Sequence, residues 1–374
     1  MRKRKIVFNC TVNVLGGAVQ NAVNFIKVVE NGDVNFDIYY FLSRAVYKQV
    51  MDILRDGSFS IFDSPARSCL SRAKIKRKVY ELEVDLVYTS AGPAYVDFPC
   101  KHIMGCSNPY LLNPSEYAIN LGGGRLSILK RRLHTKYQNR YISLADMFIF
   151  QTQSSKNELF KNILPKPFYI VPNAVRSDFK YSSSIPYSSK LSSILIPSAY
   201  YKHKNLELVV HAFRLLKETS NHEFCLCFTV TQSDFERYLA PIINEYGMSD
   251  WITNLGPFKH EEALELYLKY DIILQPSVLE VFSTTYIEAI SLLKPLVVCD
   301  LPFARDICRD YPYYFESNDI QSLANALLDC RSHYSYLRDK QNLSLEIMNN
   351  YGSQDDRVNM LISILEENLE ANNV

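Results

Sequence analysis

Short apolar runs alternate with longer amphipathic stretches along the whole 374-residue chain, and this alternation restricts the folds open to it. The chain begins with KIVFNCTV (5–12), an apolar run typical of a buried strand. A glycine pair at 16–17 then indicates a turn, AVQNAVNFIKVVE (18–30) has helical spacing, and FDIYYFL (36–42) is strand-like again. This start predicts a βαβ unit, in which a helix carries the chain between two parallel strands.

The alternation continues in two series, which predicts two doubly wound α/β domains. The stretch SDFKYSSSIPYSSKLSS (177–193) is rich in Ser, carries a proline and lacks helical periodicity, so it is the predicted linker. We therefore predict a first domain over 1–180, a second over 190–345, and a C-terminal helical segment over 346–374 that could pack back on the first domain. The further strands predicted are 85–90, 102–107, 147–152, 168–173, 193–199, 224–230, 252–256, 271–277 and 295–300. The helices predicted in the second domain are 205–217, 235–247, 260–270 and 284–293.

Composition places the chain among soluble globular proteins, with 47% hydrophobic and 22% charged residues. No apolar run approaches the roughly 20 residues of a membrane-spanning helix. The start MRKRKIVFNC lacks the apolar stretch and cleavage site of a signal peptide. The nine cysteines are an odd number and form no C-x-x-C pair, so neither zinc nor a disulfide framework is expected. We expect a cytoplasmic protein with reduced thiols.

The net charge of +1 hides two halves of opposite sign. Lys and Arg minus Asp and Glu gives 24 − 13 = +11 for 1–175, and 17 − 27 = −10 for the remainder. Two basic stretches, RAKIKRK (72–78) and KRRLHTKYQNR (130–140), carry much of the positive charge. They have three interpretations: solvated helix faces, attachment to an anionic membrane surface, and binding of nucleic acid. A sequence pI near 7.5 and the absence of a nucleic-acid-binding motif argue against the last. The spacing of the basic residues leaves an apolar helix face available to Ile75, Val79, Leu126, Leu129 and Leu133.

The stretch PSVLEVFSTTYIEAISLLKPLVVCD (276–300) places Glu280 and Glu288 eight positions apart around a cluster of hydroxyl residues. It follows a predicted strand, and a helix is predicted to begin at 283–285. In doubly wound sheets ligands bind at the carboxyl ends of strands, and the free N–H groups of a helix start favour phosphate. The pattern Thr285-x-x-Glu288 is also that of a capping box, and a glutamate in a loop needs no special role. Both interpretations stay open at this point.

A glycosidase acid and base would be a further role for the two glutamates, but their spacing disfavours it. Eight residues of helix separate two backbone positions by about 12 Å. The carboxylates of glycosidases lie about 5 to 9.5 Å apart. The spacing of Glu280 and Glu288 better suits two carboxylates at the two ends of one elongated ligand.

The order of strand, Pro-Ser, Glu, seven residues, Glu-Ala, helix, Pro, strand and Asp-Leu-Pro over 271–302 resembles the signature of the retaining GT-B glycosyltransferases. The family is glycosyltransferase family 4, which includes sucrose synthases and many bacterial lipopolysaccharide and capsule enzymes. The segments 145–175, 200–217, 252–277 and 300–327 are similar to family segments in the right order, and the first 140 residues only weakly so. The resemblance implies a GT-B fold: two Rossmann-like domains facing each other across a cleft, with the acceptor on the first and the nucleotide sugar on the second.

The resemblance also implies roles for individual residues. Glu280 would contact the transferred sugar, Glu288 the ribose hydroxyls of the nucleotide, and Lys204 the diphosphate. His203 is either a neighbour of the phosphates or a capping surface residue. No metal site and no cofactor beyond the nucleotide-sugar substrate are implied. The remaining donor contacts implied are backbone groups near Phe282, Ser283, Thr284 and Thr285 for the phosphates, Gly16 and Gly17 facing them, and Gly256 and Pro257 beside the base.

The chain departs from the family pattern at several positions. Val281 and Lys294 stand where the family usually has glycine, and Tyr200 and Tyr201 stand where an arginine is usual. Asn-Ala at 173–174 replaces a common Asn-Gly. A histidine that faces the sugar in the family has no clear match, and its place falls near Ser107 or Asn108. These departures concern the identity of the transferred sugar and some of the contacts to the phosphates.

The resulting prediction is a retaining, metal-independent glycosyltransferase that moves a sugar from a nucleotide-diphosphate sugar to a glycan or lipid-linked acceptor. It would act in O-antigen or capsule assembly, bound peripherally at the cytoplasmic face of an anionic membrane. The alternatives are a sugar-nucleotide epimerase of the same build and a catalytically degenerate partner subunit. The sequence leaves open the sugar, the nucleotide, the acceptor, the linkage and the oligomeric state.

Overall fold

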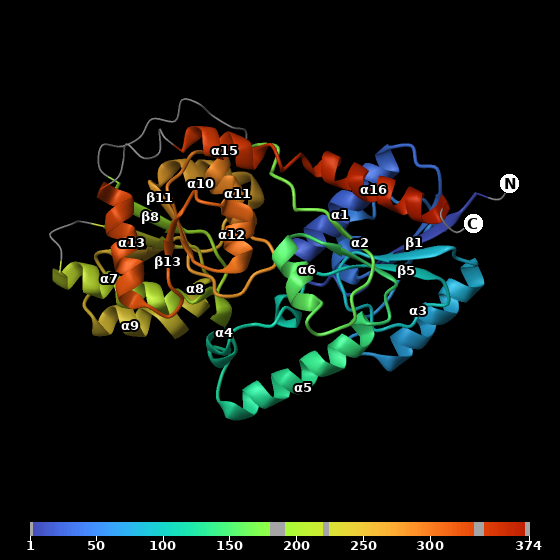
Figure 1. Cartoon of the computed structure of the whole chain (residues 1–374), viewed down its shortest axis with the longest axis horizontal. Coiled ribbons are helices and arrows are strands. Elements are labelled where there is room, and N and C mark those ends of the chain that lie inside the picture. Colours follow the sequence, from blue (N-terminus) through green and yellow to red (C-terminus); the bar gives the residue numbers. More distant parts are fainter. Residues whose placement is uncertain (1–2, 180–190, 220–223, 333–339, 371–374) are drawn as a thin grey trace. The chain divides into compact units, whose positions relative to one another are not determined.

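The computed structural model describes residues 3–179, 191–219, 224–332 and 340–370 (Figure 1). These residues divide into two compact units. Most of the predicted linker, 180–190, lies outside the described residues. Unit 1 comprises Met1–Asn113, Leu129–Ala174 and Ser353–Val374, and unit 2 comprises Pro114–Ile128 and Val175–Gly352.

Unit 1 contains a seven-stranded sheet in the order β3-β2-β1-β4-β5-β6-β7, in which every pairing is parallel. The predicted strands are confirmed, and the three-residue edge strand β3 was not predicted. The predicted Gly-Gly turn is wrong, because both glycines belong to the first turn of helix α1. The strands are β1 (Lys5–Cys10), β2 (Asp37–Leu42), β3 (Phe59–Ile61), β4 (Leu86–Thr89), β5 (Lys101–Gly105), β6 (Met147–Phe150) and β7 (Phe168–Ile170). The helices are α1 (Gly16–Asn31), α2 (Arg44–Val50), α3 (Cys69–Leu82), η1 (Pro109–Leu111), α6 (Gln153–Leu159) and α16 (Gln354–Glu370), together with α5 (Arg125–Ile142), whose first four residues are assigned to unit 2.

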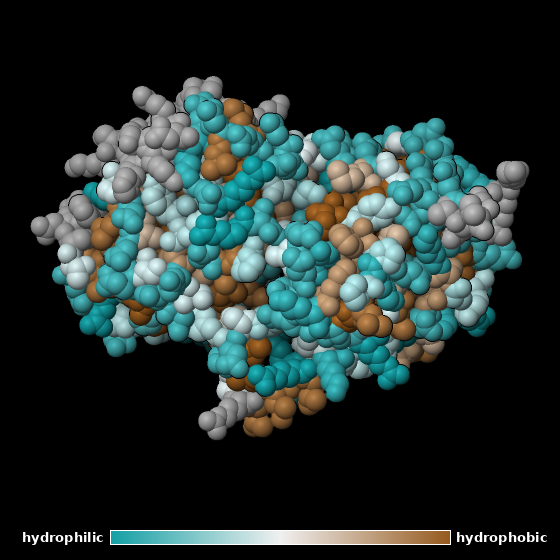
Figure 2. Space-filling view, viewed as in Figure 1, coloured by the Kyte–Doolittle hydropathy of each residue, from teal (hydrophilic) through white to brown (hydrophobic). Residues whose placement is uncertain are grey.

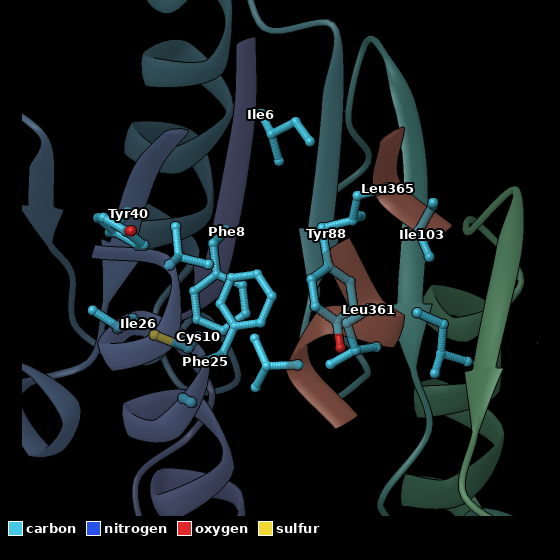
Figure 3. Close-up of a cluster of buried hydrophobic side chains, with 14 of the residues drawn as sticks. Ile6, Phe8, Cys10, Phe25, Ile26, Tyr40, Tyr88, Ile103, Leu361 and Leu365 are labelled. Atoms are coloured by element: carbon cyan, nitrogen blue, oxygen red, sulfur yellow. The ribbon is translucent and has the colours of Figure 1, made fainter. Parts of the chain in front are cut away.

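One core cluster of unit 1 lies between the middle of this sheet and helices α1 and α16 (Figure 3). Phe8 of β1 stacks on Phe25 of α1, with ring centroids 4.2 Å apart, and Tyr88 of β4 packs beside both. Leu361 and Leu365 of the C-terminal helix complete the same cluster. The last helix of the chain thus contributes apolar surface to the first unit, and burial of such surface is the main favourable term in folding.

Unit 2 contains a six-stranded parallel sheet in the order β10-β9-β8-β11-β12-β13. Its strands are β8 (Ser193–Ile196), β9 (Cys225–Phe228), β10 (Ile252–Asn254), β11 (Ile272–Gln275), β12 (Leu296–Cys299) and β13 (Tyr313–Phe315). Its helices are α4 (Glu116–Asn120), η2 (Lys202–Lys204), α7 (Leu206–Thr219), α8 (Gln232–Asp234), η3 (Phe235–Leu239), α9 (Ala240–Glu245), η4 (His260–Glu262), α10 (Ala263–Lys269), α11 (Thr284–Ser291), α12 (Pro302–Cys308), α13 (Ile320–Ser332) and α15 (Gln341–Met348). The edge strand β13 was not predicted. The two parallel sheets with surrounding helices confirm the predicted α/β class.

The helix predicted at 235–247 is interrupted in the structure. It starts as a π-helical turn, η3, and continues as α9. Pro241 in the first turn of α9 has no N–H, and its ring would clash with the carbonyl four residues earlier in a regular helix. A widened turn ahead of the proline avoids that clash.

The two units differ from the predicted domain ranges at three places. Residues 114–128 pack with unit 2 although they lie inside the range predicted for the first domain. The chain passes to unit 2 at Val175, and it returns to unit 1 at Ser353. At these passages the Val175 N–H donates to the carbonyl of Gly352 at 3.2 Å.

Candidate functional site

The order of strands in unit 2 reverses between β8 and β11, which are adjacent and parallel. The loops that follow such a pair of strands diverge, and ligands of doubly wound sheets bind in the space that this leaves. The loop after β8 leads into η2, which contains His203 and Lys204. The loop after β11 carries Glu280 and leads into α11. The chain therefore presents its predicted cation and its predicted carboxylate at the same edge of one sheet.

The two loops are joined through His203. Its carbonyl accepts hydrogen bonds from the Val278 N–H at 2.9 Å and from the Ser277 hydroxyl at 3.2 Å. The His203 ring stacks on Tyr201, with centroids 5.5 Å apart. The His203 backbone thus fixes η2 against the loop before Glu280.

Lys204 and Glu280 form an ion pair, with 2.5 Å between Nζ and Oε1, although they lie 76 positions apart in the sequence. Their side chains are only 16% and 13% exposed. Neither side chain is therefore an ordinary surface charge. Partial burial strengthens the Coulombic attraction between the two charges, because less water screens it than at the surface.

Helix α11 begins at Thr284 after an N-cap, Ser283, whose side chain makes no capping hydrogen bond. The Ser283 hydroxyl instead accepts a hydrogen bond from Nε2 of Gln275, at the end of β11, at 3.2 Å. No acidic residue lies in the first turn. The first N–H groups of α11 therefore have no side-chain cap, which leaves them suited to an anion.

The proposed capping box of Thr285 and Glu288 is not formed, because both residues lie inside α11. Glu288 is 7% exposed, and the Tyr267 hydroxyl donates to its Oε2 at 2.9 Å. Burial raises the pKa of Glu288 above its ordinary 4.5. Tyr267 was not predicted from the sequence, because its contact with Glu288 joins α10 to α11 in the folded structure.

For the remaining predicted donor-binding residues the structure shows no direct contact with Lys204 or Glu280 among the described hydrogen bonds and ion pairs. Phe282 is buried, and its ring packs edge-on against Tyr351, so only its backbone is available to a ligand. Gly256 follows the edge strand β10 with a φ of +78°, a value that favours glycine, and Pro257 comes after it. This loop shares the carboxyl edge with Lys204 but lies two strands from β8. Gly16 and Gly17 belong to unit 1, where α1 starts without a side-chain cap.

Comparison with known proteins agrees with this architecture. Residues 182–340 match the family model described as "Glycosyl transferases group 1". The O-antigen chain mannosyltransferase RfbU of Salmonella typhimurium is 25% identical over 167 residues, which are 44% of this chain and 45% of that protein. The match thus spans less than half the length of this curated relative.

Among solved structures, a glycosyltransferase from Rickettsia africae superposes with a TM-score of 0.71 at 17% identity, covering 98% of this chain and 99% of that one. HepE from Anabaena, in complex with UDP and glucose, superposes with a TM-score of 0.71 at 14% identity, covering 97% and 99%. The lipopolysaccharide outer core galactosyltransferase WaaB gives 0.66 at 16% identity, covering 97% and 99%. The fold is GT-B.

Two of the departures from the family pattern, Lys294 and Tyr200, have local explanations in the structure. Lys294 is buried, and its Nζ donates to the carbonyls of Leu268 and Tyr270 at 3.1 and 2.7 Å, which satisfies the end of α10. Burial lowers its pKa. Tyr200 stacks on Tyr238, with centroids 4.2 Å apart and planes 3° apart. Both positions therefore have structural roles in this chain.

In the described parts of the chain, no group of three or more His, Cys, Asp or Glu residues is placed to hold a metal ion. One acidic stretch, ELEVD (81–85), lies at the end of a helix, where Glu83 is the C-cap of α3. Asp85 accepts a hydrogen bond from Arg4 at 3.0 Å and from the Lys5 N–H at 2.8 Å. These carboxylates serve the packing of unit 1.

Proposed function

We propose that this GT-B protein is a retaining glycosyltransferase that moves a sugar from a nucleotide-diphosphate sugar to a glycan or lipid-linked acceptor in surface polysaccharide assembly. The observation that carries the proposal is the Lys204–Glu280 pair of 2.5 Å at the reversal point of the unit 2 sheet. The uncapped start of α11 and the buried Glu288 on the same helix support it. The match of 182–340 to group 1 glycosyltransferases supports the same activity.

The chemistry follows from the charges at this edge. As the bond between the sugar carbon and the diphosphate oxygen breaks, negative charge develops on the diphosphate, and Lys204 with the first N–H groups of α11 would offset it. Glu280 would face the positive charge that develops on the sugar carbon. The acceptor oxygen then bonds to that carbon on the face that the diphosphate leaves, and its proton passes to the departing diphosphate. The configuration at the sugar carbon is retained.

A thermal-shift screen with UDP, GDP, ADP and CMP sugars tests the proposal directly. A ligand at about 100 times its dissociation constant stabilises the folded protein by roughly 2.7 kcal/mol, which is a readily measured shift in Tm. Transfer to an acceptor separates a transferase from an epimerase, which would return an isomerised donor instead. Absence of any shift would leave only the degenerate partner subunit.

The buried Glu288 predicts an unusual pH dependence of donor binding. An ionised carboxylate accepts hydrogen bonds from both ribose hydroxyls, and protonation removes that capacity. Because burial raises the pKa of Glu288 above 4.5, affinity for the nucleotide sugar found in the screen should start to fall at a higher pH than an ordinary glutamate would give. The folded protein itself becomes more stable as the pH falls through the same range. The reason is that a raised pKa means that the folded state binds the proton more tightly than the unfolded state does.

Titration of donor affinity in wild type and in Glu288→Gln checks this prediction. A nucleotide sugar is preferred to a free diphosphate, because a terminal phosphate titrates near pH 6 itself. The Gln variant should bind more weakly, with an affinity that is flat over the acidic range. Identical pH profiles for the two proteins would remove Glu288 from the ribose site.

Peripheral binding to an anionic membrane is the part of the proposal that rests on helix α5. In the described residues no helix is long and apolar enough to cross a membrane. Leu126, Leu129 and Leu133 recur on one face of α5 and are 77%, 55% and 61% exposed. Figure 2 shows hydrophobic surface along this helix beside hydrophilic surface. The apolar face of the other basic helix, α3, is different: Ile75 and Val79 lie in the core of unit 1.

The contrast between α5 and α3 supplies a matched control for vesicle binding. Replacing Lys130, Arg131 and Arg132 of α5 with glutamine should release the protein from vesicles that contain phosphatidylglycerol, since each basic residue near such a surface contributes about 1 kcal/mol. The same change at Lys74, Arg77 and Lys78 of α3 should have a much smaller effect, because that helix offers no exposed apolar stripe. Co-sedimentation at low and high salt measures both. Wild-type protein that stays in solution at low salt would return α5 to the interpretation of a solvated face.

A further inference from the structure

The segment Pro114–Ile128 belongs to unit 2, although the chain on both sides of it belongs to unit 1. Its short helix α4 (Figure 1) follows the N-cap Ser115, whose hydroxyl accepts a hydrogen bond from the Ala118 N–H at 3.1 Å. Ala118 is 2% exposed. Part of unit 2 is therefore supplied by a segment that lies inside the sequence of unit 1, and Ala118 is a buried residue of this segment.

Tyr117 of α4 reaches the turn that carries Lys204. Its hydroxyl donates a hydrogen bond to Oδ1 of Asn205 at 2.9 Å. Asn205 is 2% exposed and has a φ of +55°, a left-handed conformation that asparagine tolerates better than most residues. Its N–H donates to the carbonyl of Lys202 at 3.1 Å, which closes the turn η2. Asn205 thus ends the turn immediately after Lys204.

The turn has two anchors, and they come from different parts of the sequence. The first is the His203 carbonyl, held by Ser277 and Val278 from the loop before Glu280. The second is the side-chain amide of Asn205. Over the described ranges, Nδ2 of Asn205 is buried without a hydrogen-bond partner, so the bond from Tyr117 is what orients this amide. Loss of that bond would leave both ends of a buried amide unsatisfied, which costs more than the bond itself contributes.

We propose that Tyr117 is a positioning residue for Lys204: through Asn205 it holds η2 in the geometry in which Lys204 meets Glu280 and binds the donor diphosphate. This inference rests on the proposed function for the role of Lys204. Binding of the donor diphosphate would then depend on the segment Pro114–Ile128. The chain on both sides of this segment belongs to unit 1, the unit predicted to receive the acceptor. Burial raises the pKa of the Tyr117 hydroxyl, which therefore stays a neutral donor over the working pH range.

The test uses Tyr117→Phe in the full chain, because this change removes the hydroxyl alone. Affinity for UDP or GDP, measured by calorimetry with whichever the wild type binds, should fall by about 3- to 10-fold, the fold-change expected for one hydrogen bond. In a Lys204→Ala background the same substitution should have little further effect, since Tyr117 acts through Lys204. Tyr80→Phe, at a tyrosine of α3 that is 59% exposed, is the matched control and should bind as wild type does.

Amide hydrogen exchange measures the stability of the η2 turn without any ligand. The N–H groups of Lys204 and Asn205, which donate to Tyr201 and Lys202, should exchange faster in Tyr117→Phe than in wild type. Unchanged exchange, or a loss of affinity that is as large without Lys204 as with it, would overturn the inference. Faster exchange in a protein that binds no nucleoside diphosphate would uphold the positioning of the turn and defeat the proposed function instead.

Discussion

Glu280→Gln should lower the rate of sugar transfer by about 100-fold or more, the scale expected when a contact made in the transition state is removed. The substitution keeps the shape of a side chain that is 13% exposed and removes its charge. Affinity for the free nucleoside diphosphate should not fall, because Glu280 is proposed to face the sugar. It could rise slightly, since Lys204 loses the carboxylate that competes with the diphosphate for it.

Steady-state kinetics and calorimetry on the same preparation separate the two quantities. Glu288→Gln serves as the comparison, because it should weaken the free diphosphate and the nucleotide sugar alike through their shared ribose. A Glu280→Gln protein with ordinary turnover would remove the residue from the reaction. Normal binding and turnover in both variants would make 276–300 a structural stretch and defeat the proposed activity at its most specific point.

Lys204→Ala should lower both the affinity for UDP or GDP and the rate of transfer. Hydrogen bonds to charged groups contribute about 1.5 to 3 kcal/mol, so we expect roughly 10- to 100-fold weaker diphosphate binding. Turnover should fall further, by about 100-fold or more, because the lost cation opposes charge that grows as the bond breaks. A drop in Tm should accompany both, since Glu280 stays partly buried without its partner.

Lys202→Ala is the matched control for this variant. Lys202 lies in the same turn, but its side chain is 43% exposed, and its Nζ pairs with Glu207 at 2.8 Å. It should change diphosphate affinity far less than Lys204→Ala does. Equal effects of the two substitutions would indicate a general contribution of positive charge, and an unchanged affinity in Lys204→Ala would take this residue out of the donor site.

Much of the fold follows from the sequence because central strands of a doubly wound sheet are buried on both faces. β4 and β11 consist of buried residues throughout and therefore stand out as continuous runs. All four edge strands have only three residues, too few to establish a period; β7 and β10 lie in stretches predicted as strands, whereas β3 and β13 were missed. The place of Glu280 and Glu288 after a strand and on the next helix was also readable, since both are local features of one stretch.

The sequence by itself determined the two α/β series and the place of Glu280 and Glu288 after one strand and on the helix that follows it. The tertiary structure alone decided which of these residues meet: Lys204 with Glu280, Tyr267 with Glu288, and Tyr117 with Asn205. It also decided that the apolar face of α3 is core and that of α5 is exposed, although both read as basic amphipathic stretches. Periodicity specifies that a helix has an apolar face, but what covers that face depends on segments far away in the chain.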